Sequence, residues 1–311
     1  MPTRECFMSN TLDNQLYDIA EALSSNSGYN LPSRSCFNEM TSDYQLYNLL
    51  RALGDNIDPD AQAYINASGA TEIQGINLFV KGIKNLGLWE NMVCWPLRST
   101  QNAGTGSTAY SLGGLGTYNG TLVNGPTWGA DGIAFVRTST QHITTTLALS
   151  GTQNCTFFAA NSTTDDNGGS GGIISLMGTR NAGAITTTVC VAFADNGSNF
   201  IESSFIINLP PSTSRPANPY TSAHVFEPTQ PILRVGANGG ALTLSVPVST
   251  PLGGTQPNLV IGHSGPVLSD RGFNGTMHFT SVFANLAMSQ SQSLALHSLL
   301  KQTLGQGLGL P

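Results

Sequence analysis

The second part of the chain is a succession of short apolar runs separated by turn residues, and this alternation limits the fold more than any other feature. Six of the 35 glycines lie in residues 1–98 and the other 29 follow. In the stretch Tyr118–Val136, the turn signals Asn119-Gly120 and Asn124-Gly125 stand beside β-branched runs of strand length. We therefore predict an all-β domain over residues 99–311.

Ten further runs of strand length follow at fairly regular spacing. They are His142–Leu149, Cys155–Ala160, Gly172–Met177, Ala184–Phe193, Asn199–Asn208, Ser222–Glu227, Ile232–Val235, Ala241–Val248, Asn258–Gly262 and Gly275–Phe283. About a dozen short strands separated by turns are typical of a two-sheet sandwich with jelly-roll topology. Trp128 lies between the first two runs, and we expect it to be buried with its indole N–H bonded to a backbone carbonyl. A short helix capped by Ser289 is expected near residue 290.

The first 57 residues contain an internal repeat at an offset of thirty residues. Arg4-Glu-Cys6-Phe7 matches Arg34-Ser-Cys36-Phe37, and the Gln-Leu-Tyr at 15–17 returns at 45–47. Each copy is predicted to hold a helix of about three turns. Either the copies dock as a tandem peptide on two equivalent pockets of a larger assembly, or they pack on each other as a helical hairpin. The candidate attachment residues are Cys6, Phe7, Leu16, Tyr17, Cys36, Phe37, Leu46 and Tyr47.

Residues 58–98 are predicted to form a helical connector. Asp58 and Pro59 begin one helix that ends at Gly69, and Thr71 caps a second helix that ends at Gly87. Trp89 and Trp95 follow as packing anchors. The chain is thus divided into a duplicated arm (1–57), a connector (58–98) and a β domain (99–311).

This connector resembles a segment of bacteriophage structural proteins that precedes a β-sandwich. The positions that carry the resemblance are Asp60, Ala63, Tyr64, Gly69, Ile76, Asn77, Phe79, Val80, Lys84, Gly87, Leu88, Trp89 and Met92. Where those proteins continue with an aromatic-rich stretch, this chain has Cys94-Trp95-Pro96-Leu97. Tyr118–Val136 in turn resembles the opening of a concanavalin A-like (laminin-G-like) sandwich, and Phe273–Ala284 resembles its final strand.

The resemblance implies a structural component of a phage virion, assembled in the host cytoplasm. It would be a head decoration, a head fibre or a tail appendage, anchored on capsid, portal or tail proteins by residues 1–57 and forming a homo-oligomer. The alternative is a lectin-like module that binds a host-surface glycan. A lectin would be expected to gather exposed aromatic residues with Asn or Asp on one face or loop cluster, which a decoration protein need not do.

Composition argues against several other classes. Charged residues make up 10% of the chain, against roughly 25% in an average soluble protein. With a net charge of -6 and no basic block, nucleic-acid binding is not expected. No apolar run is long enough for membrane insertion, and the start of the chain has no secretory signal pattern. We therefore expect free cysteines, although Cys6 and Cys36 could also pair as a disulfide.

The carboxylates of the β domain are few and scattered, so we predict no enzymatic activity. They are Asp131, Asp165, Asp166, Asp195, Glu202, Glu227 and Asp270. Loop residues such as Asp165, Asp166 and Asp195 would be the ligands of a Ca²⁺ ion, but ordinary turns are the preferred interpretation. No cofactor and no metal are predicted. The five histidines are spaced without a pattern, and His278 is expected to pack or hydrogen-bond within a strand.

Overall fold

The computed structural model describes Asp18 and residues 57–150, 153–163, 172–178, 190–195, 202–203, 217–227, 232–245, 255–263 and 272–311. The chain divides into two compact units, residues 1–62 and 63–311. The predicted arm, with all eight candidate attachment residues, lies outside the described residues apart from the helical Asp18 and from residue 57.

The two helices predicted for the connector are present. They are α5 (Pro59–Ser68) and α6 (Ile73–Asn85). Gly69 at φ 71° and Gly87 at φ 67° follow them in the left-handed conformation that ends many helices. The expected cap by Thr71 is wrong, because Glu72 is the N-cap residue and makes no side-chain cap bond. The backbone N–H groups of both residues instead donate to the Thr100 carbonyl.

After α6, a 3₁₀ turn, η1 (Trp89–Asn91), leads into the first strand, β1 (Met92–Pro96). Trp89 and Trp95 are both buried, as expected of packing anchors. β1 pairs antiparallel with β15 (Gly275–Ala284), with Trp95 opposite Thr280. Residues 92–96 of the predicted connector are therefore part of a sheet.

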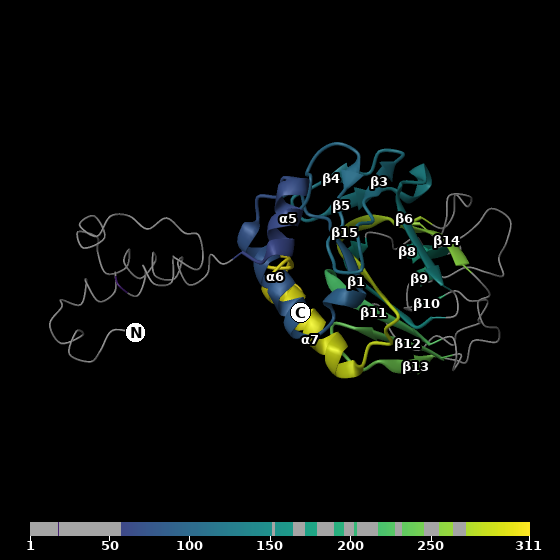
Figure 1. Ribbon diagram of the computed structural model, residues 1–311. Helices are drawn as coiled ribbons and strands as arrows, with labels where there is room; N and C mark the ends of the chain where they lie inside the picture. Colours follow the sequence, from purple (N-terminus) through teal and green to yellow (C-terminus); the bar gives the residue numbers. More distant parts are fainter. Residues whose placement is uncertain are drawn as a thin grey trace. The chain divides into compact units, whose positions relative to one another are not determined.

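Two antiparallel sheets form a sandwich (Figure 1). Within the described residues, sheet A has the order β13-β12-β11-β7-β15-β5-β4, with β1 added beside β15, and sheet B has the order β10-β9-β8-β14-β6-β3-β2. The remaining strands of sheet A are β4 (Thr127–Trp128), β5 (Ile133–Phe135), β7 (Cys155–Thr163), β11 (Tyr220–Glu227), β12 (Ile232–Ala237) and β13 (Thr243–Ser245). Those of sheet B are β2 (Thr108–Ala109), β3 (Gly120–Val123), β6 (His142–Ser150), β8 (Gly172–Gly178), β9 (Cys190–Asp195), β10 (Glu202–Ser203) and β14 (Thr255–Ile261).

Each of the ten predicted runs overlaps one of these strands, and the fold prediction is confirmed: the chain is mainly β, with a small helical region. A second 3₁₀ turn, η2 (Arg137–Ser139), joins β5 to β6. Among the described helices, none is both long enough and apolar enough to cross a lipid bilayer.

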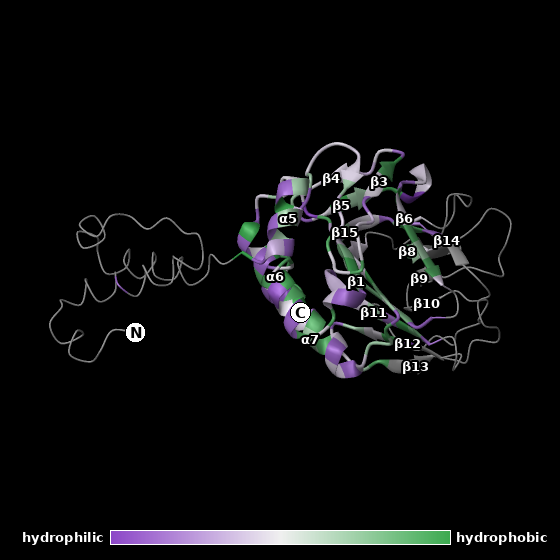
Figure 2. Cartoon of the chain, viewed as in Figure 1, coloured by the Kyte–Doolittle hydropathy of each residue, from purple (hydrophilic) through white to green (hydrophobic). Residues whose placement is uncertain are grey.

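The main core lies between the two sheets. On β7, Phe157 and Ala159 belong to this core, whereas Phe158 points to the other face of sheet A. There Phe279 of β15 makes edge-to-face contacts with Phe158 and with Phe79 of α6, whose ring centroid lies 5.4 Å away. Sheet A is therefore packed on both faces, against sheet B and against helices that mix apolar with hydrophilic residues (Figure 2).

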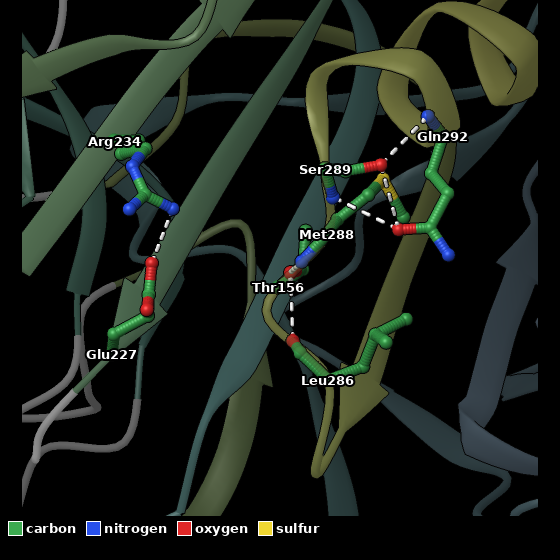
Figure 3. A network of polar contacts seen from close by, with 7 residues as sticks. All are labelled: Thr156, Glu227, Arg234, Leu286, Met288, Ser289 and Gln292. Carbon is green, nitrogen blue, oxygen red and sulfur yellow. Dashed lines mark hydrogen bonds and ion pairs between the residues drawn. The ribbon is translucent and has the colours of Figure 1, made fainter.

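Helix α7 (Gln290–Gln302) covers the same outer face of sheet A. It begins with a capping box in which Ser289 and Gln292 exchange hydrogen bonds, as the Ser289 prediction requires (Figure 3). Just before it, the Thr156 hydroxyl of β7 donates to the Leu286 carbonyl at 2.9 Å and accepts from the Met288 N–H at 3.0 Å. These bonds fix the start of α7 to the sheet.

Candidate functional site

The outer face of sheet B is the broad sheet surface that no described helix covers. Figure 1 shows α5, α6 and α7 on the side of β1 and β15, whereas β6, β8 and β14 lie on the opposite side. Burial along β6 confirms this, because Leu147 and Leu149 are buried while Thr146 and Ala148 between them are exposed. A ligand can therefore reach this face without displacing a helix.

Short hydroxyl side chains line this surface. Thr108 of β2 pairs with Thr121 of β3, and Thr121 pairs with Thr144 of β6, so three threonines form a row across three strands. Thr146 and the exposed Asn258 of β14 extend the row. We call these five residues the threonine face. None of them carries a charge, and each offers both hydrogen-bond donors and acceptors.

Three half-buried aromatic residues lie on segments next to these strands, and the rings of Tyr118 and Trp128 pack against the edge of the core between the sheets. Tyr110 follows β2, Tyr118 precedes β3, and Trp128 lies on β4. The Trp128 indole N–H donates to the Gly106 carbonyl at 3.1 Å, so the predicted bond is confirmed. The predicted burial of Trp128 is wrong in degree, because β4 is a two-residue strand at the edge of sheet A and leaves part of the ring accessible.

A buried asparagine holds the loop that leads to Tyr110. The Asn102 side-chain amide donates to the carbonyls of Pro96 and Tyr110 at 2.8 and 2.9 Å, and its oxygen accepts from the N–H groups of Ala103 and Tyr110. Only 1% of Asn102 is exposed. The sequence contains no signal for this residue, because residues 101–116 are rich in Gly, Ser and Thr and an Asn among them has the composition of an ordinary turn.

Carboxylates do not gather into a reactive group in the described part of the chain. Glu227 forms an ion pair with Arg234 of the neighbouring strand (Figure 3). Asp131 accepts a hydrogen bond from His278 through its backbone carbonyl. Asp165, Asp166 and Asp270 lie outside the described residues, and the side chains of Asp195 and Glu202 are not described. No group of three His, Cys, Asp or Glu residues suited to a metal occurs within the described ranges, and the absence of a metal or cofactor stays a prediction.

The five histidines are all buried, with 0–5% of each residue exposed. His278 donates from Nδ1 to the Asp131 carbonyl and its Nε2 accepts from the Ser162 hydroxyl, which confirms the expected role within a strand. His297 of α7 donates from Nε2 to the Pro311 carbonyl and its Nδ1 accepts from Thr221 of β11. These histidines are structural links within sheet A and between sheet A and α7.

Burial also sets the protonation of these groups. It lowers the pKa of His224 from 6.5 to about 3, and it also lowers the pKa values of His278 and His297. It raises the pKa of the Cys155 thiol to about 12 and also raises the pKa of the Cys94 thiol. Both cysteines are free, as expected, and their burial makes them poor nucleophiles.

The free energy of unfolding is expected to fall as the pH drops from about 6.5 towards 3, because of His224. In this window the unfolded chain binds a proton on His224 and the folded chain does not, so the folded state loses about 1.4 kcal/mol for each pH unit. Urea unfolding at pH 7, 6, 5 and 4 measures the slope. In the variant His224→Phe the change in the free energy of unfolding per pH unit should be smaller by the contribution of about one proton. An unchanged slope would show that His224 does not cause the loss of stability.

Comparison with known proteins concerns the fold. No family model matches the chain, and no curated protein matches it. The sialidase of Trypanosoma rangeli in complex with 2,3-difluorosialic acid is similar over 75% of this chain and 39% of its own, at 12% identity and a TM-score of 0.50. The CBM40 domain of an IT-sialidase from Ruminococcus gnavus, bound to α2,3-sialyllactose, is matched over 47% of this chain and 82% of its own, at 15% identity and a TM-score of 0.36.

The likeness to the Trypanosoma rangeli protein is one of fold, and the chain spans about two fifths of that protein's length. It corrects one prediction. The chain was predicted to be no enzyme, and this exclusion is wrong, because the Trypanosoma rangeli sialidase, a protein of similar fold, is an enzyme. The sandwich predicted from the sequence is confirmed, whereas the virion role stays a prediction, because no comparison supports it.

Proposed function

We propose that the chain is a β-sandwich module that binds a carbohydrate on the threonine face and on the accessible parts of the aromatic rings of neighbouring segments. The observation that carries this proposal is the threonine face itself, which lies on the side of sheet B that no described helix covers and whose five side chains are short, uncharged and rich in hydroxyls. A sugar presents hydroxyl donors and acceptors together with apolar C–H groups. Threonine and asparagine side chains match the former, and the rings of Tyr118 and Trp128 match the latter.

The chemistry of the face favours a neutral sugar. A carboxylate-bearing sugar is best held by Arg or Lys, and the threonine face contains neither. The similar fold of the Trypanosoma rangeli sialidase, whose structure contains 2,3-difluorosialic acid, supports a role among proteins that handle sugars. For this chain the surface itself supports an uncharged glycan rather than a sialic acid.

Binding is expected to neutral polysaccharides and to weaken when the threonine face is altered. The probes are an immobilised glucan, a mannan and a galactan, with 3′-sialyllactose as the acidic comparison. Thr121→Glu places a carboxylate in the centre of the row and should lower the affinity about tenfold, because it removes one hydroxyl partner and adds a strongly hydrated group. Trp128→Ala should weaken binding as well.

The matched control is Gln302→Glu, which adds the same charge on the exposed end of α7. It should leave binding unchanged. The proposal fails if the intact chain binds none of the neutral probes, or if Gln302→Glu weakens binding as much as Thr121→Glu does. Preference for 3′-sialyllactose over every neutral probe would keep a glycan site but place it elsewhere.

A second proposal concerns where the module is displayed. We propose that residues 1–57 attach it to a larger assembly, a phage virion with contacts to capsid, portal or tail proteins. The thirty-residue duplication and the division of the chain into residues 1–62 and 63–311 support this role. Deletion of residues 1–57 should release the protein from purified particles. Particles that retain the shortened chain at full occupancy would rule out this attachment.

A further inference from the structure

One place in the interior of the sandwich is polar rather than apolar. It lies on the inner face of sheet A, where Ala159 of β7 pairs with Ser222 of β11 on one side and with Thr280 of β15 on the other. Asn161 follows two residues later on the same face of β7, opposite Tyr220. Ser222, Thr280 and Asn161 are each 0% exposed.

Four atoms of these three side chains have no hydrogen-bond partner among the described residues. They are the Asn161 Oδ1 and Nδ2, the Ser222 Oγ and the Thr280 Oγ1. Native interiors seldom leave a buried polar atom unpaired, because its lost hydration is not replaced. Three such side chains on neighbouring strands point to a shared partner.

The geometry of the sheet leaves room for a small partner. Strands lie about 4.8 Å apart, so Ser222 and Thr280, which flank β7, have Cα atoms roughly 10 Å apart. Each Cβ stands roughly perpendicular to the sheet, so each hydroxyl oxygen can shift about 1.4 Å towards the other, which leaves a gap of roughly 7 Å, or two to three hydrogen-bond lengths. The residue of β7 that lies between them is Ala159, whose side chain is a single methyl group.

We propose that one or two ordered water molecules are bound over Ala159 and link Ser222, Thr280 and the Asn161 side chain. Water fits because it donates and accepts, as the two hydroxyls and the amide require. An ion fits poorly, since no charged side chain lies in the rung of Ser222, Ala159, Thr280 and Trp95 or in the next rung of Tyr220, Asn161 and Met277. This site is separate from the threonine face and does not depend on sugar binding.

Removing a hydroxyl tests the proposal by the sign of the change in stability. If the hydroxyls are dry, Thr280→Val and Ser222→Ala remove an unpaired polar group and make the protein more stable. If they bind water, each variant loses a hydrogen bond, and the equilibrium constant for unfolding should rise roughly two- to tenfold. Urea unfolding of the full chain measures this change.

Magnetic relaxation dispersion of deuterium or ¹⁷O counts long-lived internal water directly. Thr280→Val and Ser222→Ala should each have at least one such water fewer than the unaltered chain. Ser281→Ala is the control, since Ser281 is equally buried but its hydroxyl lies on the other face of β15 and donates to the Phe158 carbonyl. The number of long-lived waters decides between the outcomes. If neither Thr280→Val nor Ser222→Ala has fewer such waters than the unaltered chain, the proposal is wrong, whatever the stability of the variants. If either variant has fewer and Ser281→Ala does not, the proposal is supported.

Discussion

Replacing Trp95 by Ala should lower the free energy of unfolding by about 3–5 kcal/mol, a large part of the stability of one domain. Trp95 is 0% exposed and belongs to the core between the sheets. Its indole N–H donates to the Tyr118 carbonyl at 3.0 Å, so the variant also leaves that carbonyl without its partner. Urea unfolding followed by circular dichroism measures the loss.

Trp128→Ala is the matched comparison, because it removes the same side chain from a half-buried site at the sheet edge. Its indole is also bonded to a backbone carbonyl, so the two variants differ chiefly in burial. We expect the free energy of unfolding to fall by about half as much as in Trp95→Ala, or less. An equal loss for both tryptophans would show that Trp128 is a core residue after all.

Gly132→Ala is expected to be destabilising by about 3 kcal/mol or more, because no other residue fits that position. Gly132 has φ 153°, and a Cβ atom there would overlap the Met277 carbonyl of β15. The overlapping atom is backbone in a central strand, so neither partner can move without breaking the pairing of β5 with β15. Thermal unfolding of the full chain measures this effect.

Gly125→Ala provides the control for backbone strain alone. Gly125 also has a positive φ, 72°, but nothing lies within 4 Å of a Cβ atom placed on it. We expect Gly125→Ala to lower the free energy of unfolding by about 1 kcal/mol. If Gly132→Ala costs no more than Gly125→Ala, the chain can relax around the added methyl group and close packing does not explain the glycine.

Local signals in the sequence were enough for most of the β domain. The run His142–Leu149 became β6, and the Ser289 cap began α7 one residue later. Both depend on residues close in the chain: the period-two alternation of strands and the capping of a helix by the residue before it. Where the structure differs, the cause is pairing between distant residues.

Trp95 illustrates that limit. The sequence placed it in the connector, because the Gly-rich part of the chain begins only after residue 98. Its burial in the sandwich comes from the pairing of β1 with β15, nearly the whole domain away. The threonine face has the same limit. The alternation of Thr144 and Thr146 along β6 can be seen in the sequence, but their alignment with Thr108 and Thr121 depends on how β2, β3 and β6 pair.

The position of β15 also has a consequence for how the protein is made. β15 lies between β7 and β5 in the middle of sheet A and also pairs with β1, yet it is the last strand of this sequence to be synthesised. Until the ribosome has added residues 275–284, β7 has no neighbour on one side and the apolar Phe157 and Ile133 stay exposed. Closure of the sandwich must therefore wait until residues 275–284 have been synthesised, and a nascent chain that stalls before β15 is a target for chaperones or proteases.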